Sequence, residues 1–138
     1  MFLLDTSVLS ELAKPHPDLA VSRRIHGTEP DRLFASELSR YEIRYGAMLR
    51  PRSEELWDTV MRKVLPLPIW LPIDDGISLA TGELDAELRR RGTPLGLVET
   101  FLAATALRHQ LVLVTREFRR FAGVPGLTIE NWFPEAAR

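Results

Sequence analysis

The chain has 138 residues, of which 45% are hydrophobic, and its 18 basic and 19 acidic residues leave a formal charge of −1. This length fits one domain over residues 1–138, the lack of cysteine excludes disulfides and thiolate metal sites, and the balanced charge offers no electrostatic case for nucleic acid. No apolar run approaches the roughly 20 residues that cross a bilayer, and the start lacks the basic region of a signal peptide, so we expect a cytoplasmic protein without membrane contact.

The first elements are a buried strand and two short helices. Residues 1–5, "MFLLD", are typical of a buried strand that ends at Asp5. A helix is expected over 6–14, with Asp5 or Thr6 as its cap, and two prolines close it. Residues 18–27 predict a second helix that ends at Gly27.

The middle of the chain repeats the alternation of strand and helix. We expect a strand over 32–36 and amphipathic helices over 37–50 and 53–65, because apolar side chains recur there at spacings of three and four. Residues 66–73, "PLPIWLPI", read as an extended stretch broken by prolines.

The last part contains the most apolar helix and the clearest strand. Helices are predicted over 74–92 and 97–110, a strand over 111–115, and a final strand with an aromatic tail over 126–133. Strands that alternate with helices predict an α/β protein, a three-layer α/β/α sandwich around a mostly parallel sheet. In such sheets, functional residues collect at the carboxyl ends of the strands.

Four acidic residues occupy positions where they could meet. Asp5 follows the first strand, Glu117 comes shortly after the strand over 111–115, and Glu42 and Glu99 lie on helices that could face them. Each has a local explanation as a helix cap, an ion-pair partner or a first-turn acid. Carboxylates that converge in one cleft repel one another, so their joint placement favours a cation such as Mg²⁺ or Mn²⁺.

The order of motifs resembles a known family. The segments "MFLLDTSVLSEL", "YEIRYGAML", "GTPLGLVETFLAATALRHQLVLVTREF" and "NWF" together look like a PIN-domain protein of the VapC toxin type, over nearly the whole chain. This resemblance implies a PIN-like α/β/α fold and a Mg²⁺- or Mn²⁺-dependent endoribonuclease that acts on RNA. It also implies a VapB-like antitoxin as partner, and a homodimer.

The resemblance assigns the site residue by residue. Asp5 matches the first family acid, Glu42 the second, Glu99 the third, and Glu117 is the best match to the fourth. The polar residues carried over as supporting or substrate-binding groups are Thr6, Ser7, Thr115 and Arg116.

Two positions depart from the family pattern. Glu99 stands where the family normally has Asp, and its extra methylene moves the carboxylate by about 1.5 Å. In "VTREFRRF" the Asn and the spacer that normally follow Thr-Arg are missing, which brings Glu117 close to the strand end. Because Mg²⁺ needs near-octahedral geometry, these changes leave a weakened or altered site open.

Other readings remain. A dehalogenase-type phosphatase would need a second Asp two places after Asp5, where the chain has Ser7, and the sequence contains no P-loop or HExxH motif. The alternatives are a catalytically impaired PIN domain that binds RNA or antitoxin, and dispersed acids that only cap helices. Met48, Leu49 and Trp57 are candidates either for a dimer interface or for the core.

Overall fold

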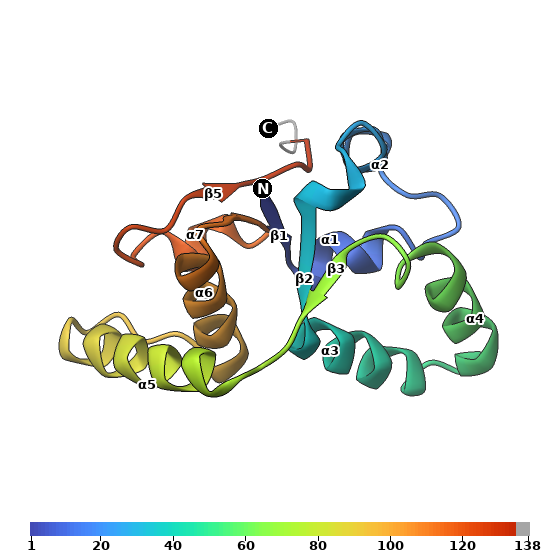
Figure 1. Cartoon of the computed structure of the whole chain (residues 1–138). Coiled ribbons are helices and arrows are strands. Elements are labelled where there is room, and N and C mark those ends of the chain that lie inside the picture. Colours follow the sequence, from blue (N-terminus) through green and yellow to red (C-terminus); the bar gives the residue numbers. More distant parts are fainter. Residues whose placement is uncertain (135–138) are drawn as a thin grey trace.

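A five-stranded parallel sheet forms the centre of the molecule in the computed structural model, which describes residues 1–134 (Figure 1). All four neighbouring strand pairs are parallel. In the order in which they lie across the sheet, the strands are β3 (Ile69–Leu71), β2 (Leu33–Ser36), β1 (Phe2–Leu4), β4 (Val112–Val114) and β5 (Ile129–Glu130).

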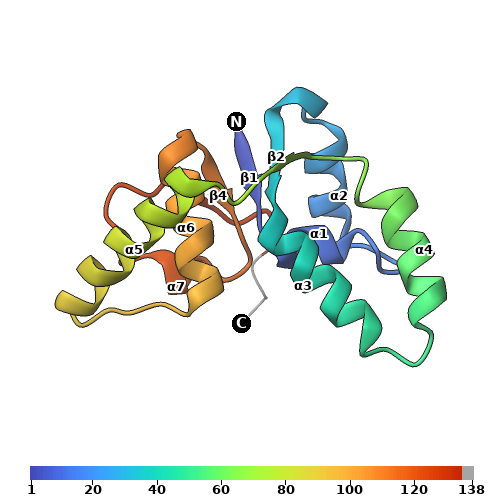
Figure 2. The same cartoon turned by 60° about the horizontal axis from the view of Figure 1, so that its bottom comes forward.

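Helices cover both faces of this sheet, as Figures 1 and 2 show. The helices on one face are α1 (Thr6–Glu11), α2 (Leu19–His26), α3 (Glu37–Met48) and α4 (Ser53–Lys63). Those on the other face are α5 (Asp75–Arg90), α6 (Leu97–His109) and α7 (Phe118–Phe121). The expected three-layer α/β/α sandwich is therefore confirmed, and the sheet is parallel throughout the described residues.

Alternation along the central strands builds two cores. Leu3 and Leu113 are fully buried against the α5–α7 side, whereas their neighbours Leu4 and Val114 are fully buried against the α1–α4 side. Successive side chains of a strand point to opposite faces, so each strand contributes to both cores. With the central strands anchored on both faces, the residues that follow them have fixed positions.

The structure differs from the sequence expectation at several element boundaries, of which three bear on the arrangement of the sheet and the site. The proline-rich stretch over 66–73 contains β3, which pairs with β2 at the edge of the sheet. Pro68 and Pro72 flank this strand, and an edge position tolerates their missing N–H groups. Helix α7 lies where no element was expected, and α1 ends at Glu11, before the predicted end at residue 14.

The interface candidates on α3 and α4 have different surroundings. Trp57 packs against the α1–α4 core. The Arg44 guanidinium lies over the Trp57 ring, with its Cζ atom 4.5 Å from the ring centroid. Met48 and Leu49 are 54% and 68% exposed. Trp57 thus belongs to the core, while the other two remain available at the surface. Within residues 1–134, no helix has the length and apolar character needed to cross a membrane.

Candidate functional site

The four predicted acids line one pocket at the carboxyl edge of the sheet. Asp5 directly follows β1, Glu42 lies on α3 after β2, Glu99 lies in the first turn of α6, and Glu117 follows β4. Their approach follows from the parallel topology, which brings the ends of β1, β2 and β4 to the same edge. The pocket has a volume of about 190 Å³. The four acids therefore share one pocket, while Asp5 also caps α1 and Glu99 also forms an ion pair with Arg120.

Asp5 is held in place by neutral donors. Its Oδ1 accepts a hydrogen bond of 2.7 Å from the backbone N–H of Thr6, so that Asp5 caps α1. Its Oδ2 accepts one of 2.7 Å from the buried hydroxyl of Thr115 and a longer one of 3.4 Å from Ser7. Only 9% of Asp5 is exposed. These contacts fix the orientation of the carboxylate without neutralising its charge.

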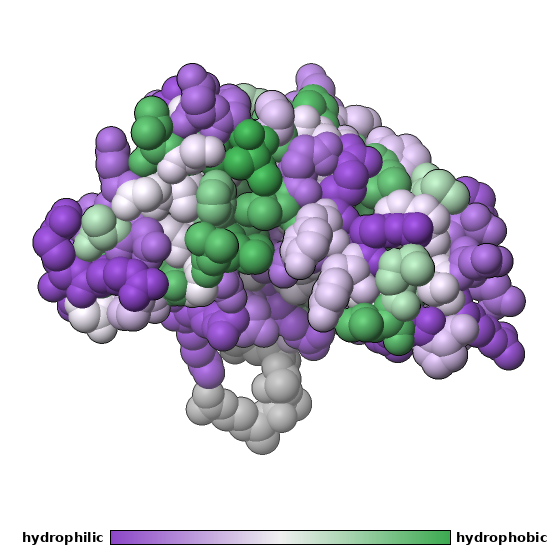
Figure 3. All heavy atoms as spheres, turned by 90° about the horizontal axis from the view of Figure 1, so that it is seen from below, coloured by the Kyte–Doolittle hydropathy of each residue, from purple (hydrophilic) through white to green (hydrophobic). Residues whose placement is uncertain are grey.

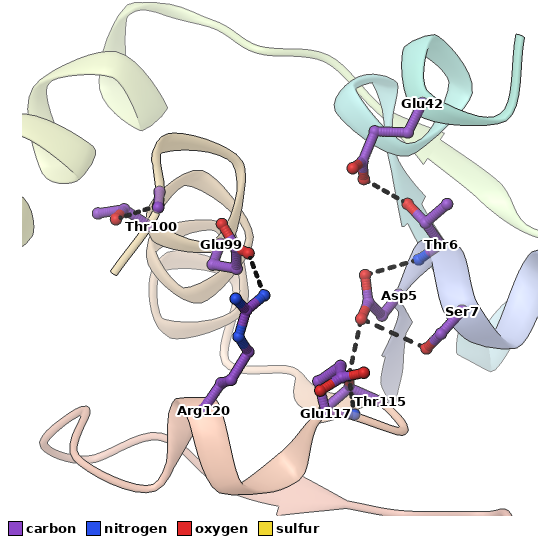
Figure 4. Close-up of polar contacts among 10 residues, drawn as sticks. Asp5, Thr6, Ser7, Glu42, Glu99, Thr100, Thr115, Glu117 and Arg120 are labelled. Carbon is purple, nitrogen blue, oxygen red and sulfur yellow. Dashed lines mark hydrogen bonds and ion pairs between the residues drawn. The ribbon is translucent and has the colours of Figure 1, made fainter. Parts of the chain in front are cut away.

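Glu42 is tied to the same cluster through a neighbour of Asp5. The Thr6 hydroxyl donates a hydrogen bond of 2.6 Å to Glu42 Oε1 (Figure 4). The same residue thus offers its N–H to Asp5 and its hydroxyl to Glu42. Thr6 therefore couples the positions of the first two acids.

Glu99 lies across the pocket and has a charged partner. Its Oε1 accepts a hydrogen bond of 2.7 Å from Arg120 Nη1, on α7 (Figure 4). Glu99 Oε2 lies against Gly96, the N-cap of its own helix, where a Cβ atom would overlap the carboxylate. The extra methylene of Glu99 thus folds back toward the helix N-terminus, a favourable place for negative charge.

The remaining predicted residues lie around β4. The Thr115 hydroxyl accepts a hydrogen bond of 3.0 Å from the Glu117 N–H while it donates to Asp5. Ser7 accepts one of 3.3 Å from the Arg116 N–H. The Arg116 side chain lies over the ring of Phe133, 4.4 Å from its centroid, and is not among the residues that line the pocket. Glu117 is exposed and lines the pocket.

The pKa values of Asp5 and Glu42 are raised, with burial as the largest cause. Burial raises the pKa of Asp5, hydrogen bonds from Thr115, Thr6 and Ser7 lower it, and the charge of Glu99 raises it. Burial also raises the pKa of Glu42, the Thr6 hydroxyl lowers it, and the charges of Asp5 and Glu99 raise it. These carboxylates therefore repel one another, which favours a cation between them.

The donor set suits a hard divalent cation, although the side chains do not form a finished coordination shell. Carboxylate and hydroxyl oxygens line the pocket, and these are the ligands that Mg²⁺ and Mn²⁺ take. As they stand, no three acidic or histidine side chains of residues 1–134 are grouped closely enough to hold a metal ion. Direct coordination by three of these carboxylates would need a side-chain rearrangement, because Glu99 Oε1 faces Arg120 in this structure.

The sequence did not indicate two residues of the site. Arg120 is a pocket residue, but in the sequence it is one of several arginines in "REFRRF". The helical turn of α7, which directs it to Glu99, was not predicted. Gly96 resembles an ordinary helix-start glycine, and its role depends on the side-chain conformation of Glu99. No sequence signal distinguishes either one.

Comparison with known proteins assigns the chain to a family. The sequence matches the PIN domain over residues 2–127. The tRNA(fMet)-specific endonuclease VapC of Salmonella typhimurium is 31% identical over 131 residues, which cover 95% of this chain and 97% of that protein. The VapC ribonuclease Y4jK of Sinorhizobium fredii is 32% identical over 140 residues, covering 97% and 99%.

Solved structures agree with this assignment. DNA-bound VapBC from Salmonella typhimurium contains a chain that superposes with a TM-score of 0.86 at 30% identity, covering 95% of this chain and 97% of that one. FitAcB from Neisseria gonorrhoeae gives a TM-score of 0.86 at 25% identity, covering 96% and 98%. With its parallel sheet, its pocket of four acids and these relatives, the chain belongs to the PIN domain family and is of the VapC type.

Proposed function

We propose that this chain is a divalent-metal-dependent endoribonuclease, the toxin component of a VapBC-type toxin–antitoxin pair. The observation that carries the proposal is the crowding of Asp5, Glu42 and Glu99 around one pocket, where charge repulsion adds to the raised pKa of the first two. Relatives named as VapC ribonucleases support hydrolysis of RNA phosphodiester bonds.

The side chains have distinct parts in this proposal. Asp5, Glu42 and Glu99 hold Mg²⁺ or Mn²⁺, with Glu117 completing the cleft. The ion, when bound, lowers the pKa of a water molecule and offsets negative charge on the phosphate. Thr115, Thr6 and Ser7 keep the Asp5 carboxylate in one orientation.

Two residues at the edge of the site would act on the substrate. Glu117 is exposed beside the pocket, a position from which a carboxylate orients or deprotonates an attacking water. Arg116 is also exposed and adjacent to Glu117 in the chain, so that its guanidinium is available to a substrate phosphate.

The alternative is a PIN domain whose metal site has drifted and which only binds RNA or antitoxin. The ion pair between Glu99 and Arg120 favours this binding-module alternative, because Arg120 occupies one of the carboxylates that a metal ion would need. An assay of RNA cleavage with and without Mn²⁺ separates the two functions. A folded wild-type protein that binds its antitoxin but cleaves no RNA with Mn²⁺ would support the binding module.

Removal of the first acid should abolish cleavage. Asp5→Asn keeps the size of the side chain and its ability to cap α1, but it removes a charge from the pocket. We expect at least about a 100-fold loss of Mn²⁺-dependent cleavage on a panel of defined RNAs, since even outer-shell changes at metal sites cost 10–100-fold. Glu83→Gln, an exposed change on α5, is the matched control and should leave cleavage unchanged. Equal cleavage by the Asp5 variant would contradict the proposal.

A second prediction concerns stability without metal. Because the folded-state pKa of Glu42 is raised, its charged form destabilises the fold once the pH exceeds that pKa. Glu42→Gln should therefore raise the Tm of the metal-free protein at pH 7 by about 2–5 °C. The difference in Tm between Glu42→Gln and the wild type should become smaller as the pH falls toward about 4, where an ordinary Glu takes up its proton. Differential scanning calorimetry in a chelator measures both effects.

Addition of Mn²⁺ completes that experiment. The ion should raise the Tm of the wild type and of Glu83→Gln, because it binds only the folded state. It should have little effect on Glu42→Gln, which lacks a ligand. An equal Mn²⁺-induced rise in all three proteins would place the metal elsewhere.

A groove lies beside the acidic pocket. It has a volume of about 280 Å³, lies between α1, α3 and α4, and includes Glu42 among its lining residues. Its walls are mainly apolar, and two basic side chains lie at its rim: Arg50, and Lys14, which is paired with Glu11 at 2.9 Å. We propose that it takes an apolar segment of the VapB-like antitoxin, with acidic groups near the two basic side chains.

Filling this groove should weaken antitoxin binding. A Cβ atom at Gly46 meets no other atom within 4 Å, so Gly46→Phe adds a ring to the groove without a clash at its Cβ. We expect at least about a tenfold rise in Kd for the polypeptide encoded by a small adjacent reading frame, by calorimetry, because the ring and the antitoxin compete for one space. Gly82 on α5 has equally open surroundings, and Gly82→Phe is the control. Equal weakening by both variants would reject the groove.

The exposed face of α3 is our candidate for a homodimer contact. Tyr41 and Tyr45 stack with ring centroids 6.1 Å apart, and with Met48 and Leu49 they form one exposed stripe. On the face seen from below, Figure 3 shows the strongest hydrophobic colour on the side of α5 and α6, whereas the side of α3 is paler. We expect size-exclusion chromatography with light scattering to give the mass of a dimer for the wild type and of a monomer for Met48→Glu. The introduced carboxylate would have to lose its water in the dimer interface, which costs free energy. Met61→Glu, on exposed α4, should remain dimeric.

A further inference from the structure

We propose that Arg120 is a resident counter-cation of the acidic pocket, which holds Glu99 in the metal-free protein and must release it before Glu99 binds a divalent ion. The inference rests on the proposed metal site. It adds a positioning residue that limits metal affinity and that the sequence pattern does not indicate.

The first observation is that a basic side chain of the pocket pairs with just one of its acids. Among the residues of 1–134 that line the pocket, Arg120 is the only basic one, and its Nη1 lies 2.7 Å from Glu99 Oε1. Asp5 and Glu42 receive neutral donors instead. The one positive side chain at the pocket is therefore committed to one acid.

The second observation is the folded-back conformation of Glu99. Its Oε2 lies against Gly96, and its Oε1 faces Arg120. Figure 4 shows Glu99 directed to Arg120, across the pocket from Asp5 and Glu42. The helix N-terminus and the guanidinium both favour negative charge at this place. Together they account for the absence of a ready-made group of three ligands among the described residues.

A divalent ion and the guanidinium would compete for the same carboxylate. Mg²⁺ and Mn²⁺ need ligand oxygens at about 2.0–2.2 Å, and a nearby guanidinium also repels the ion. The Arg120 side chain is 61% exposed and that of Glu99 is 25% exposed, so solvent weakens their attraction. The competition should therefore change metal affinity by a small factor rather than block the site.

The opposite role gives the opposite prediction. If Arg120 instead held Glu99 ready for the metal, its removal would loosen a ligand and weaken binding. The sign of the change in Mn²⁺ affinity therefore decides between a competitor and a support.

The experiment is calorimetric titration of Mn²⁺ into the metal-free proteins. Arg120→Gln removes the charge, and we expect its Kd for Mn²⁺ to be about two- to fivefold lower than that of the wild type. Arg119→Gln is the matched control, because Arg119 lies on the same helix over the ring of Phe118, 5.5 Å from its centroid. It should bind Mn²⁺ like the wild type. An unchanged or higher Kd for Arg120→Gln would overturn the inference.

A double-mutant cycle tests whether the effect passes through Glu99. In a Glu99→Gln background the ion pair is absent, so Arg120→Gln should tighten Mn²⁺ binding less than it does in the wild-type background. An equal gain in both backgrounds would show a general charge effect and overturn the proposal.

The titration also separates this inference from the proposed function. If no protein binds Mn²⁺, both fail. If the wild type binds Mn²⁺ and Arg120→Gln binds it no more tightly, the result supports the proposed metal site but rejects the inferred role of Arg120. Binding by Arg120→Gln alone would mean that Arg120 blocks the site, which would overturn the weak competition that we infer.

Discussion

The site depends on one constraint, the delivery of like charges to a single edge by a parallel sheet. The carboxyl ends of β1, β2 and β4 meet there, and the segments that follow them carry Asp5, Glu42 and Glu117. Helix α6 approaches the same edge with its first turn and adds Glu99. The two cores hold these segments in place, so the backbone positions that carry the acids cannot separate without loss of packing. Repulsion among them is therefore built into the fold.

The protein meets this repulsion in two ways. Asp5 and Glu42 receive hydrogen bonds from hydroxyl and amide groups, which orient them but leave the pKa of each above its ordinary value. Glu99 forms an ion pair with the positively charged Arg120. Neutral donors keep two acids in position for a cation, whereas the ion pair supplies one acid with a substitute for that cation. The three carboxylates are thus unequally prepared for metal.

Much of this edge could be predicted from the sequence because it rests on local patterns. A buried strand that ends in Asp5, and apolar periodicity on either side of Glu42 and Glu99, indicate both the elements and the edge at which they meet. The edge strand β3 was harder to predict, because its flanking prolines remove the pattern of an ordinary strand. Arg120 was missed for another reason. Its contact joins α7 to α6 over 21 positions of the chain, and no spacing rule connects them.

The departure of Glu99 from the family pattern and its pairing with Arg120 are best understood together. A glutamate has one more rotatable bond than an aspartate, so its carboxylate has more positions open to it at the same backbone site. Here it folds back over Gly96, where the missing Cβ leaves room for it, and meets Arg120. The same added bond gives the carboxylate a way to turn toward Asp5 when a cation replaces the guanidinium. The longer side chain therefore makes an exchange between two partners feasible, and in our proposal the affinity for a metal ion depends on the Glu99–Arg120 pair.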